Sequence, residues 1–132
     1  MKEHKILIAD DMQSMRSLLK SILVKAGFVD LTEVDNGRSA MDMIQETKFD
    51  LVICDWDMPH MTGIQVLESI RADDDLYKTP FIMVSANADR EKVNSAIESG
   101  TDGYVIKPLQ PDTLLKIVAK LLSIPGDLAA TA

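Results

Sequence analysis

The sequence has a single cysteine, no long apolar run and fewer basic than acidic residues. One cysteine cannot form an internal disulfide, which excludes a disulfide-stapled secreted domain and favours the cytoplasm. No apolar segment approaches the ~20 residues of a membrane span, and the acidic end of MKEHKILIADD does not fit a signal peptide. With 14 Lys and Arg against 21 Asp and Glu, the net charge of −7 argues against general nucleic-acid binding. We therefore expect neither nucleic-acid nor membrane partners.

The 132 residues have the length and composition of one soluble globular domain, with 46% hydrophobic and 27% charged residues. Short apolar runs alternate with segments of helical periodicity. The runs that predict strands are Lys5–Ala9, Leu31–Val34, Phe49–Cys54, Pro80–Val84 and Tyr104–Ile106. The helical segments are 12–26, a second that begins after Asn36-Gly37, Ile64–Ile70, Asp89–Ser99 and a last one capped by Asp112. We predict a domain over residues 1–123 and a short flexible tail over 124–132.

The alternation of buried strands with helices of ~10–15 residues predicts right-handed βαβ crossovers. Such crossovers build an α/β fold in which helices cover both faces of a five-stranded parallel sheet. The strand order 2-1-3-4-5 is taken from known flavodoxin-like sheets, because the alternation alone does not determine it. In this order, residues far apart in the sequence meet at one edge of the sheet.

Four of the predicted strands end in a polar or charged group: Asp10-Asp11, Asp55, Ser85 and Lys107. Ligands of open α/β sheets bind outside the carboxyl ends of the strands, so we expect these side chains to converge. Two carboxylates ~4 Å apart repel by about 4 kcal/mol at an effective dielectric of 20, so the acids require protonation or a cation. Oxygen ligands without a nearby thiolate or imidazole favour Mg²⁺ or a similar hard ion.

A cation, a lysine and a hydroxyl around one carboxylate are typical of phosphoryl transfer, which depends on positioning and charge neutralisation. In this interpretation Asp55 is the nucleophile and becomes an aspartyl phosphate, while Lys107 meets the anion. Simpler explanations exist for each residue taken alone. Asp10-Asp11 could cap the first helix, Ser85 could belong to a turn, and Lys107 could be a solvated strand end.

Four segments carry a family resemblance: ADD at 9–11, DWDMPHMTG at 55–63, SAN at 85–87 and GYVIKP at 103–108. Their order and spacing resemble the receiver domain of bacterial two-component response regulators, and the resemblance covers residues 4–123. It implies that Asp10 and Asp11 are metal-site acids and that Asp55 is the phosphoacceptor. The backbone carbonyl of Asp57 would complete the Mg²⁺ shell, and its side chain occupies a position that tunes the lifetime of the phosphoryl group.

The same resemblance assigns roles to the later segments. Ser85, where Thr is commoner, would bond the phosphoryl oxygens, and Lys107 would pair with them. Tyr104 would be an aromatic switch whose side chain turns inward when Ser85 moves toward the phosphate. The peptide between Lys107 and Pro108 is expected to be cis, and Asn87 occupies the second position that tunes the phosphoryl lifetime.

The resemblance implies a monomeric signalling switch that catalyses nothing beyond its own phosphorylation and dephosphorylation. A histidine kinase or phosphotransfer protein would donate the phosphoryl group. The surface of the fourth helix, fifth strand and fifth helix would then bind an output protein. A flagellar motor switch protein in chemotaxis signalling is the expected partner. A phosphorelay shuttle and the receiver part of a longer regulator are the alternatives.

Two other function classes fit parts of the sequence. A haloacid-dehalogenase-like phosphatase would use Asp55-Trp56-Asp57 as nucleophile and acid, but such a motif belongs on the first strand of a larger, capped fold. A flavodoxin-like flavin carrier shares the topology, but the acidic loop DDMQSM after the first strand would repel a phosphate-bearing cofactor. Catalytic release of phosphate from small esters would favour the first class, and flavin absorbance the second.

Overall fold

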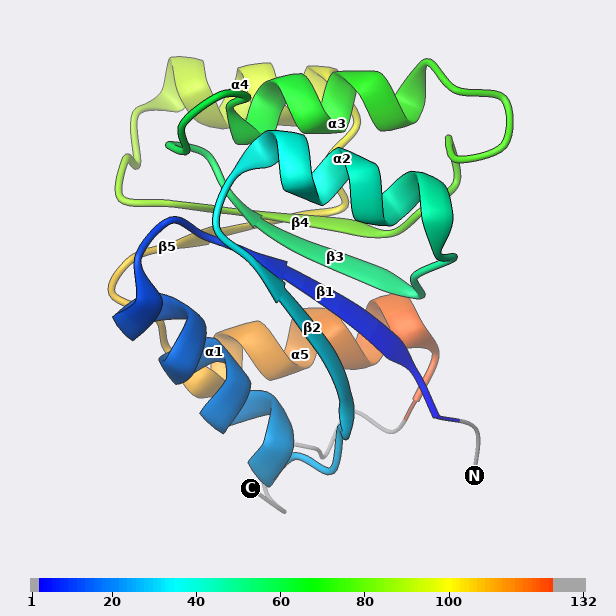
Figure 1. The fold of residues 1–132 in the computed structure, drawn as a ribbon. Helices are drawn as coiled ribbons and strands as arrows, with labels where there is room; N and C mark the ends of the chain where they lie inside the picture. Colours follow the sequence, from blue (N-terminus) through cyan, green and yellow to red (C-terminus); the bar gives the residue numbers. More distant parts are fainter. Residues whose placement is uncertain (1–2, 125–132) are drawn as a thin grey trace.

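Between residues 3 and 124, which the computed structural model describes, five strands alternate with five helices as the sequence pattern predicts (Figure 1). The strands are β1 (Lys5–Ala9), β2 (Asp30–Val34), β3 (Leu51–Asp55), β4 (Phe81–Ser85) and β5 (Gly103–Ile106). The helices are α1 (Gln13–Lys25), α2 (Gly37–Glu46), α3 (Gly63–Arg71), α4 (Arg90–Glu98) and α5 (Pro111–Leu122). Apart from Ile124, the tail expected over 124–132 lies outside the described residues.

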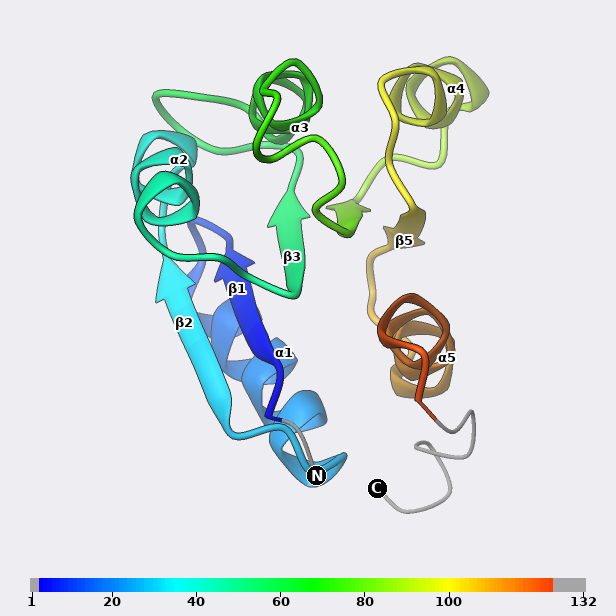
Figure 2. The same cartoon turned by 90° about the vertical axis from the view of Figure 1, so that its right-hand side faces the viewer.

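The strands form one sheet in the order β2-β1-β3-β4-β5, and every neighbouring pair is parallel. The predicted fold class and strand order are therefore confirmed. Helices α2, α3 and α4 cover one face of the sheet and α1 and α5 cover the other (Figures 1 and 2). Because parallel strands all end at the same edge, this topology gathers the loops after β1, β3, β4 and β5.

The two faces of the sheet bury two apolar cores, and successive strand residues alternate between them. In β1, Leu7 and Ala9 pack toward α2 and α3, whereas Ile6 and Ile8 pack toward α1 and α5. The central strands β3 and β4 are buried along their whole length, and β2 at the edge is only partly buried. Within residues 3–124, no helix combines the length and apolar character needed to cross a membrane.

Several sequence-based boundaries need correction. Asp112 does not cap the last helix: the N-cap is Gln110, without a side-chain cap bond, and Asp112 lies in the first turn. The helix starts earlier because Pro111, with its fixed φ and missing N–H, suits the first helical position. Leu18, which the periodicity places on the apolar stripe of α1, is 43% exposed. Strand β3 starts at Leu51 rather than Phe49 and includes Asp55.

Candidate functional site

The carboxyl edge of the sheet brings together the side chains predicted to converge there. Asp10 follows β1, Asp55 ends β3, and both are buried, with exposures of 0% and 4%. Asp11 is exposed, but one of its carboxylate oxygens lies within 4.8 Å of an oxygen from each of the other two acids. Three carboxylates from two neighbouring strand ends therefore share one small volume.

Lys107, which follows β5, is the cation of this cluster. Its Nζ lies 3.2 Å from Oδ1 of Asp55 and 3.4 Å from Oδ2 of Asp10. Although that Asp10 oxygen is within ion-pair distance of Lys107, it is buried and accepts no hydrogen bond. One ammonium cannot neutralise three carboxylates, so the cluster retains negative charge and a buried oxygen in need of a ligand. An all-oxygen donor set of this kind fits Mg²⁺ or a similar hard cation.

Backbone and arginine contacts hold in place the loop that carries Asp10. Oδ1 of Asp10 accepts a hydrogen bond from the backbone N–H of Met12 at 2.9 Å. Arg16 on α1 donates through Nη1 to the Asp10 carbonyl at 2.7 Å, and its Nε lies 3.4 Å from Glu33 of β2. Arg16 was not among the predicted site residues, because nothing in its local sequence places it against the loop before it. These contacts position Asp10 and leave its second oxygen for the site.

Crowding of charge alters the acid–base properties of the site. Burial, and then the charge of Asp10, raise the pKa of Asp55 to about 6, although Lys107 acts in the opposite direction. Burial alone would lower the pKa of Lys107, but the charges of Asp55 and Asp10 outweigh it and raise that pKa. Burial also raises the pKa of the Cys54 thiol, so this cysteine is an unreactive core residue.

We expect the metal-free protein to lose stability as the pH rises. The folded pKa of Asp55 lies above its ordinary value of 3.8, so its contribution to stability is complete below that value and is lost as pH rises through about 6. Between about pH 4.5 and about pH 7.5 this single group should cost about 2 kcal/mol of unfolding free energy. The effect is measured by urea unfolding in EDTA, as the difference in unfolding free energy between wild type and Asp55→Asn. The contributions of the other titrating groups cancel in that difference. A difference that does not vary with pH would contradict it.

Ser85 and Tyr104 meet at the same residue of the loop between β4 and α4. The buried Oγ of Ser85 accepts the backbone N–H of Asn87 at 3.0 Å, and the Tyr104 hydroxyl donates to the Asn87 carbonyl at 2.8 Å. The Asn87 side chain in turn accepts the N–H of Asp89 at 2.7 Å. Asp89, at the start of the predicted helical segment, caps α4 by accepting the N–H of Glu91. A continuous chain of hydrogen bonds therefore runs from the end of β4 to the start of α4.

The loop after β3 is fixed by the close approach of α3. The N–H of Gly63 donates to the Trp56 carbonyl at 2.8 Å, and a Cβ at Gly63 would collide with the Asp55 carbonyl. The side chain of Asp57 is exposed, in the same loop. The peptide between Lys107 and Pro108 is cis, as expected. Of the predicted residues, the structure thus gathers Asp10, Asp11, Asp55 and Lys107, with Ser85 at the adjoining strand end.

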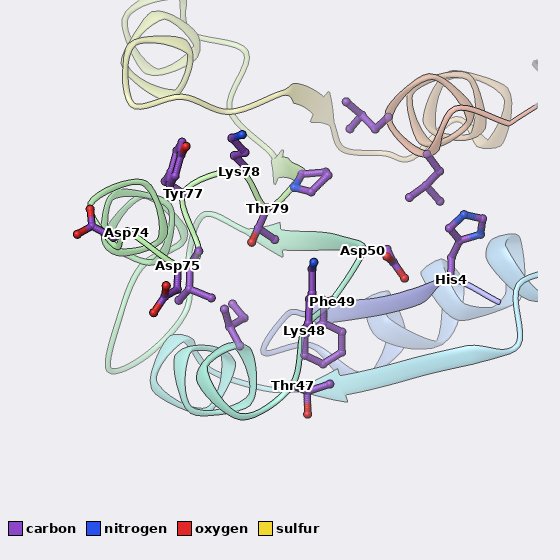
Figure 3. A pocket seen from close by; sticks show the side chains of 15 residues that line it. His4, Thr47, Lys48, Phe49, Asp50, Asp74, Asp75, Tyr77, Lys78 and Thr79 are labelled. Carbon is purple, nitrogen blue, oxygen red and sulfur yellow. The ribbon is translucent and has the colours of Figure 1, made fainter. Parts of the chain in front are cut away.

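A pocket of about 600 Å³ lies elsewhere, at the amino ends of the strands (Figure 3). Its labelled lining includes His4, Lys48, Asp50 and Thr79, which precede β1, β3 and β4. None of the predicted site residues lines it. This pocket is therefore separate from the site that the converging charges form.

Comparison with known proteins identifies the family of this chain. Residues 6–119 match the response regulator receiver domain family. The chain is 41% identical over 120 residues to chemotaxis protein CheY-3 of Vibrio cholerae, covering 91% of this chain and 92% of that protein. It is 40% identical over 117 residues to chemotaxis protein CheY of Pseudomonas aeruginosa, covering 89% and 94%.

Solved structures give the same result. Chemotaxis response regulator CheY4 of Vibrio cholerae superposes with a TM-score of 0.83 at 33% identity, covering 92% of this chain and all of that one. The receiver domain of sensor histidine kinase PA1611 from Pseudomonas aeruginosa shares the fold, with a TM-score of 0.84 at 22% identity and coverage of 92% and 99%. That structure holds a magnesium ion in its active site cleft. On the match over residues 6–119, this chain belongs to the response regulator receiver domain family.

Proposed function

We propose that this receiver domain accepts a phosphoryl group on Asp55 from a phosphohistidine donor and thereby switches its binding to an output protein. The observation that carries the proposal is the placement of Asp55. Its carboxylate ends the central strand β3, with Lys107 at 3.2 Å and the carboxylates of Asp10 and Asp11 beside it. A receiver of this family is a signalling protein, not a metabolic phosphatase or a flavin carrier.

The reaction is an in-line displacement at phosphorus. An Asp55 carboxylate oxygen forms the new P–O bond as the P–N bond to the donor imidazole breaks, and the imidazole leaves with the electron pair of that bond. Lys107, now paired with Asp55 Oδ1, would follow the charge to a phosphoryl oxygen. Ser85 Oγ accepts from Asn87, so its own hydroxyl proton can be donated to another phosphoryl oxygen.

Mg²⁺ would be held by the carboxylates of Asp10, Asp11 and Asp55 and by the Asp57 carbonyl. When bound, it supplies charge neutralisation for the phosphoryl oxygens. The buried, unbonded Oδ2 of Asp10 supports this assignment, since such an oxygen is costly without a ligand. The exposed side chains of Asp57 and Asn87 flank the acceptor loop and the Ser85 loop, and we assign them to tuning the phosphoryl lifetime.

The signal would leave through the contacts around Asn87. Once Ser85 donates its hydroxyl proton to a phosphoryl group, it would hold Asn87, and with it the Tyr104 hydroxyl and the start of α4, in the arrangement described above. The surface of α4, β5 and α5 would then bind the output protein. The likeness to chemotaxis proteins over nine-tenths of the chain supports a flagellar motor switch as that partner, with a histidine kinase or phosphotransfer protein as donor. A phosphorelay shuttle or part of a longer regulator would use the same site.

We also infer that residues 1–123 are the functional unit, acting as a cytoplasmic monomer through protein partners. Sedimentation of the phosphorylated and unphosphorylated protein tests the oligomeric state: one species of monomer mass in both supports it, and a phosphorylation-dependent dimer contradicts it.

The chemistry is tested with a small phosphodonor. Wild type incubated with acetyl phosphate and Mg²⁺, then quenched in acid, should gain the mass of one phosphoryl group. The same incubation with EDTA in place of Mg²⁺ should give little or none, because the three carboxylates would then repel the anionic donor. Equal uptake with and without Mg²⁺, or no uptake in either, would contradict the proposal.

A further inference from the structure

Lys92 on α4 makes a contact that the phosphoacceptor chemistry does not use. Its Nζ lies 4.8 Å from the centroid of the Trp56 ring, within the range of a cation–π interaction. Trp56 directly follows Asp55 and is 8% exposed, in the core beneath α2, α3 and α4. A charged side chain from a helix thus rests on the residue next to the acceptor.

Trp56 is fixed to the frame of the domain on both sides. Its backbone N–H donates to the Val84 carbonyl in β4 at 2.9 Å, and its backbone carbonyl accepts the N–H of Gly63 at the start of α3. The backbone of Trp56 therefore cannot move far without disturbing the end of β3. A side chain that contacts the Trp56 ring therefore acts on a residue whose backbone is fixed directly beside Asp55.

Helix α4, in contrast, has few apolar attachments. Its only buried residue is Ala96, whereas α3 buries Gly63, Val66, Leu67 and Ile70. Lys92 lies four residues before Ala96 and so on the same face of the helix. Two sets of polar contacts join α4 to the acceptor side of the sheet: the Ser85–Asn87–Tyr104 contacts at its start and Lys92 on Trp56. A third polar contact lies beyond the end of the helix, where Arg71 Nε donates to the Gly100 carbonyl.

We propose that Lys92 is a positioning residue that couples α4 to the acceptor site through Trp56. Two contacts are present together in the observed arrangement of α4: Lys92 Nζ lies over the Trp56 ring, and the Tyr104 hydroxyl donates to the Asn87 carbonyl. A phosphoryl group that accepts the Ser85 hydroxyl proton, and so engages Asn87 through Ser85, favours this arrangement. By linkage, the Lys92 contact in turn favours binding of the phosphoryl group. The inference rests on the proposed function, since it concerns how that same site is regulated.

The test measures the affinity of the Mg²⁺-loaded protein for beryllofluoride, a phosphoryl analogue, by calorimetry. Lys92→Met, which keeps the length of the side chain and removes its charge, should weaken binding roughly fivefold, within the range of a partly buried cation–π contact. Lys92→Arg should restore wild-type affinity, because a guanidinium also stacks on an aromatic ring. Arg90→Met, which removes a charge from an exposed position of the same helix, should bind as wild type does.

Emission of Trp56, the one tryptophan of the chain, gives a second readout that a general loss of stability would not reproduce. In the unloaded protein, Lys92→Met should change this emission, and Lys92→Arg and Arg90→Met should leave it closer to wild type. Equal beryllofluoride affinity in Lys92→Met and Arg90→Met would overturn the role of Lys92 while the proposed function stands. A wild type that neither binds beryllofluoride nor takes up phosphate would overturn both.

Discussion

Asp55→Asn is expected to abolish phosphoryl uptake from acetyl phosphate. The amide has no anionic oxygen to attack phosphorus, and no other carboxylate of the cluster ends the central strand beside Lys107. Loss of a nucleophile lowers the rate by more than roughly a thousandfold. Intact-mass measurement after acid quench should therefore give only the unmodified mass under conditions that fully load wild type.

The same variant should fold at least as well as wild type without metal. The neutral amide removes a buried charge whose ionisation opposes folding near neutral pH. Asp74→Asn, a matched change in the exposed loop after α3, should keep full uptake and wild-type stability. Uptake by Asp55→Asn equal to that of Asp74→Asn would place the acceptor elsewhere.

Lys107→Met is expected to impair both stability and reaction. Without the ammonium, Asp10 and Asp55 face each other buried and uncompensated, and removing one partner of a buried pair typically costs about 3 kcal/mol or more. Because Lys107 lowers the pKa of Asp55, its removal moves that pKa above about 6, and protonation of Asp55 then relieves part of the loss. In EDTA we therefore expect a loss of about 2–3 kcal/mol near pH 7.5 that shrinks as the pH falls toward about 6. The phosphorylation rate should fall by roughly a hundredfold or more, because a preorganised cation at the phosphoryl oxygens is lost.

Two comparisons control this experiment. Lys107→Arg keeps the charge and should recover most of the stability. It should recover less of the phosphorylation rate, because the planar guanidinium does not place its charge where the lysine ammonium does. Lys116→Met removes an exposed lysine from α5 and should change neither property. If Lys107→Met were as stable as Lys116→Met near pH 7.5, the ion pairs to Asp10 and Asp55 would not have the energetic role assigned to them.

The convergence of the site was predictable because it follows from topology and not from side-chain packing. In a parallel sheet the residue after each strand lies at a common edge, so the positions of Asp10, Asp55, Ser85 and Lys107 in the sequence were enough. The order of the strands was not predictable from the alternation of elements. It is taken from known flavodoxin-like sheets, and the observed order β2-β1-β3-β4-β5 confirms it.

Contacts between distant surface side chains could not be predicted. Lys92 and Trp56 are 36 positions apart, and Arg16 reaches Asp10 only because α1 turns back along the sheet. In the sequence each is an ordinary charged helix residue. Aspartate is common at helix N-caps, which favours Asp112 as the cap, but the helix already begins at Pro111 and its N-cap is Gln110. At this helix end the preference of proline for the first helical position outweighed the preference of aspartate for the cap.

The most direct test of the account is to identify the residue that carries the phosphoryl group. Wild type loaded with acetyl phosphate and Mg²⁺ is reduced with borohydride, which converts an acyl phosphate to an alcohol, and is then digested and sequenced by tandem mass spectrometry. We predict homoserine at position 55 and unmodified aspartate at positions 10, 11 and 57. Homoserine at any of those three positions, or aspartate at position 55 in protein that has gained a phosphoryl mass, would contradict the central claim.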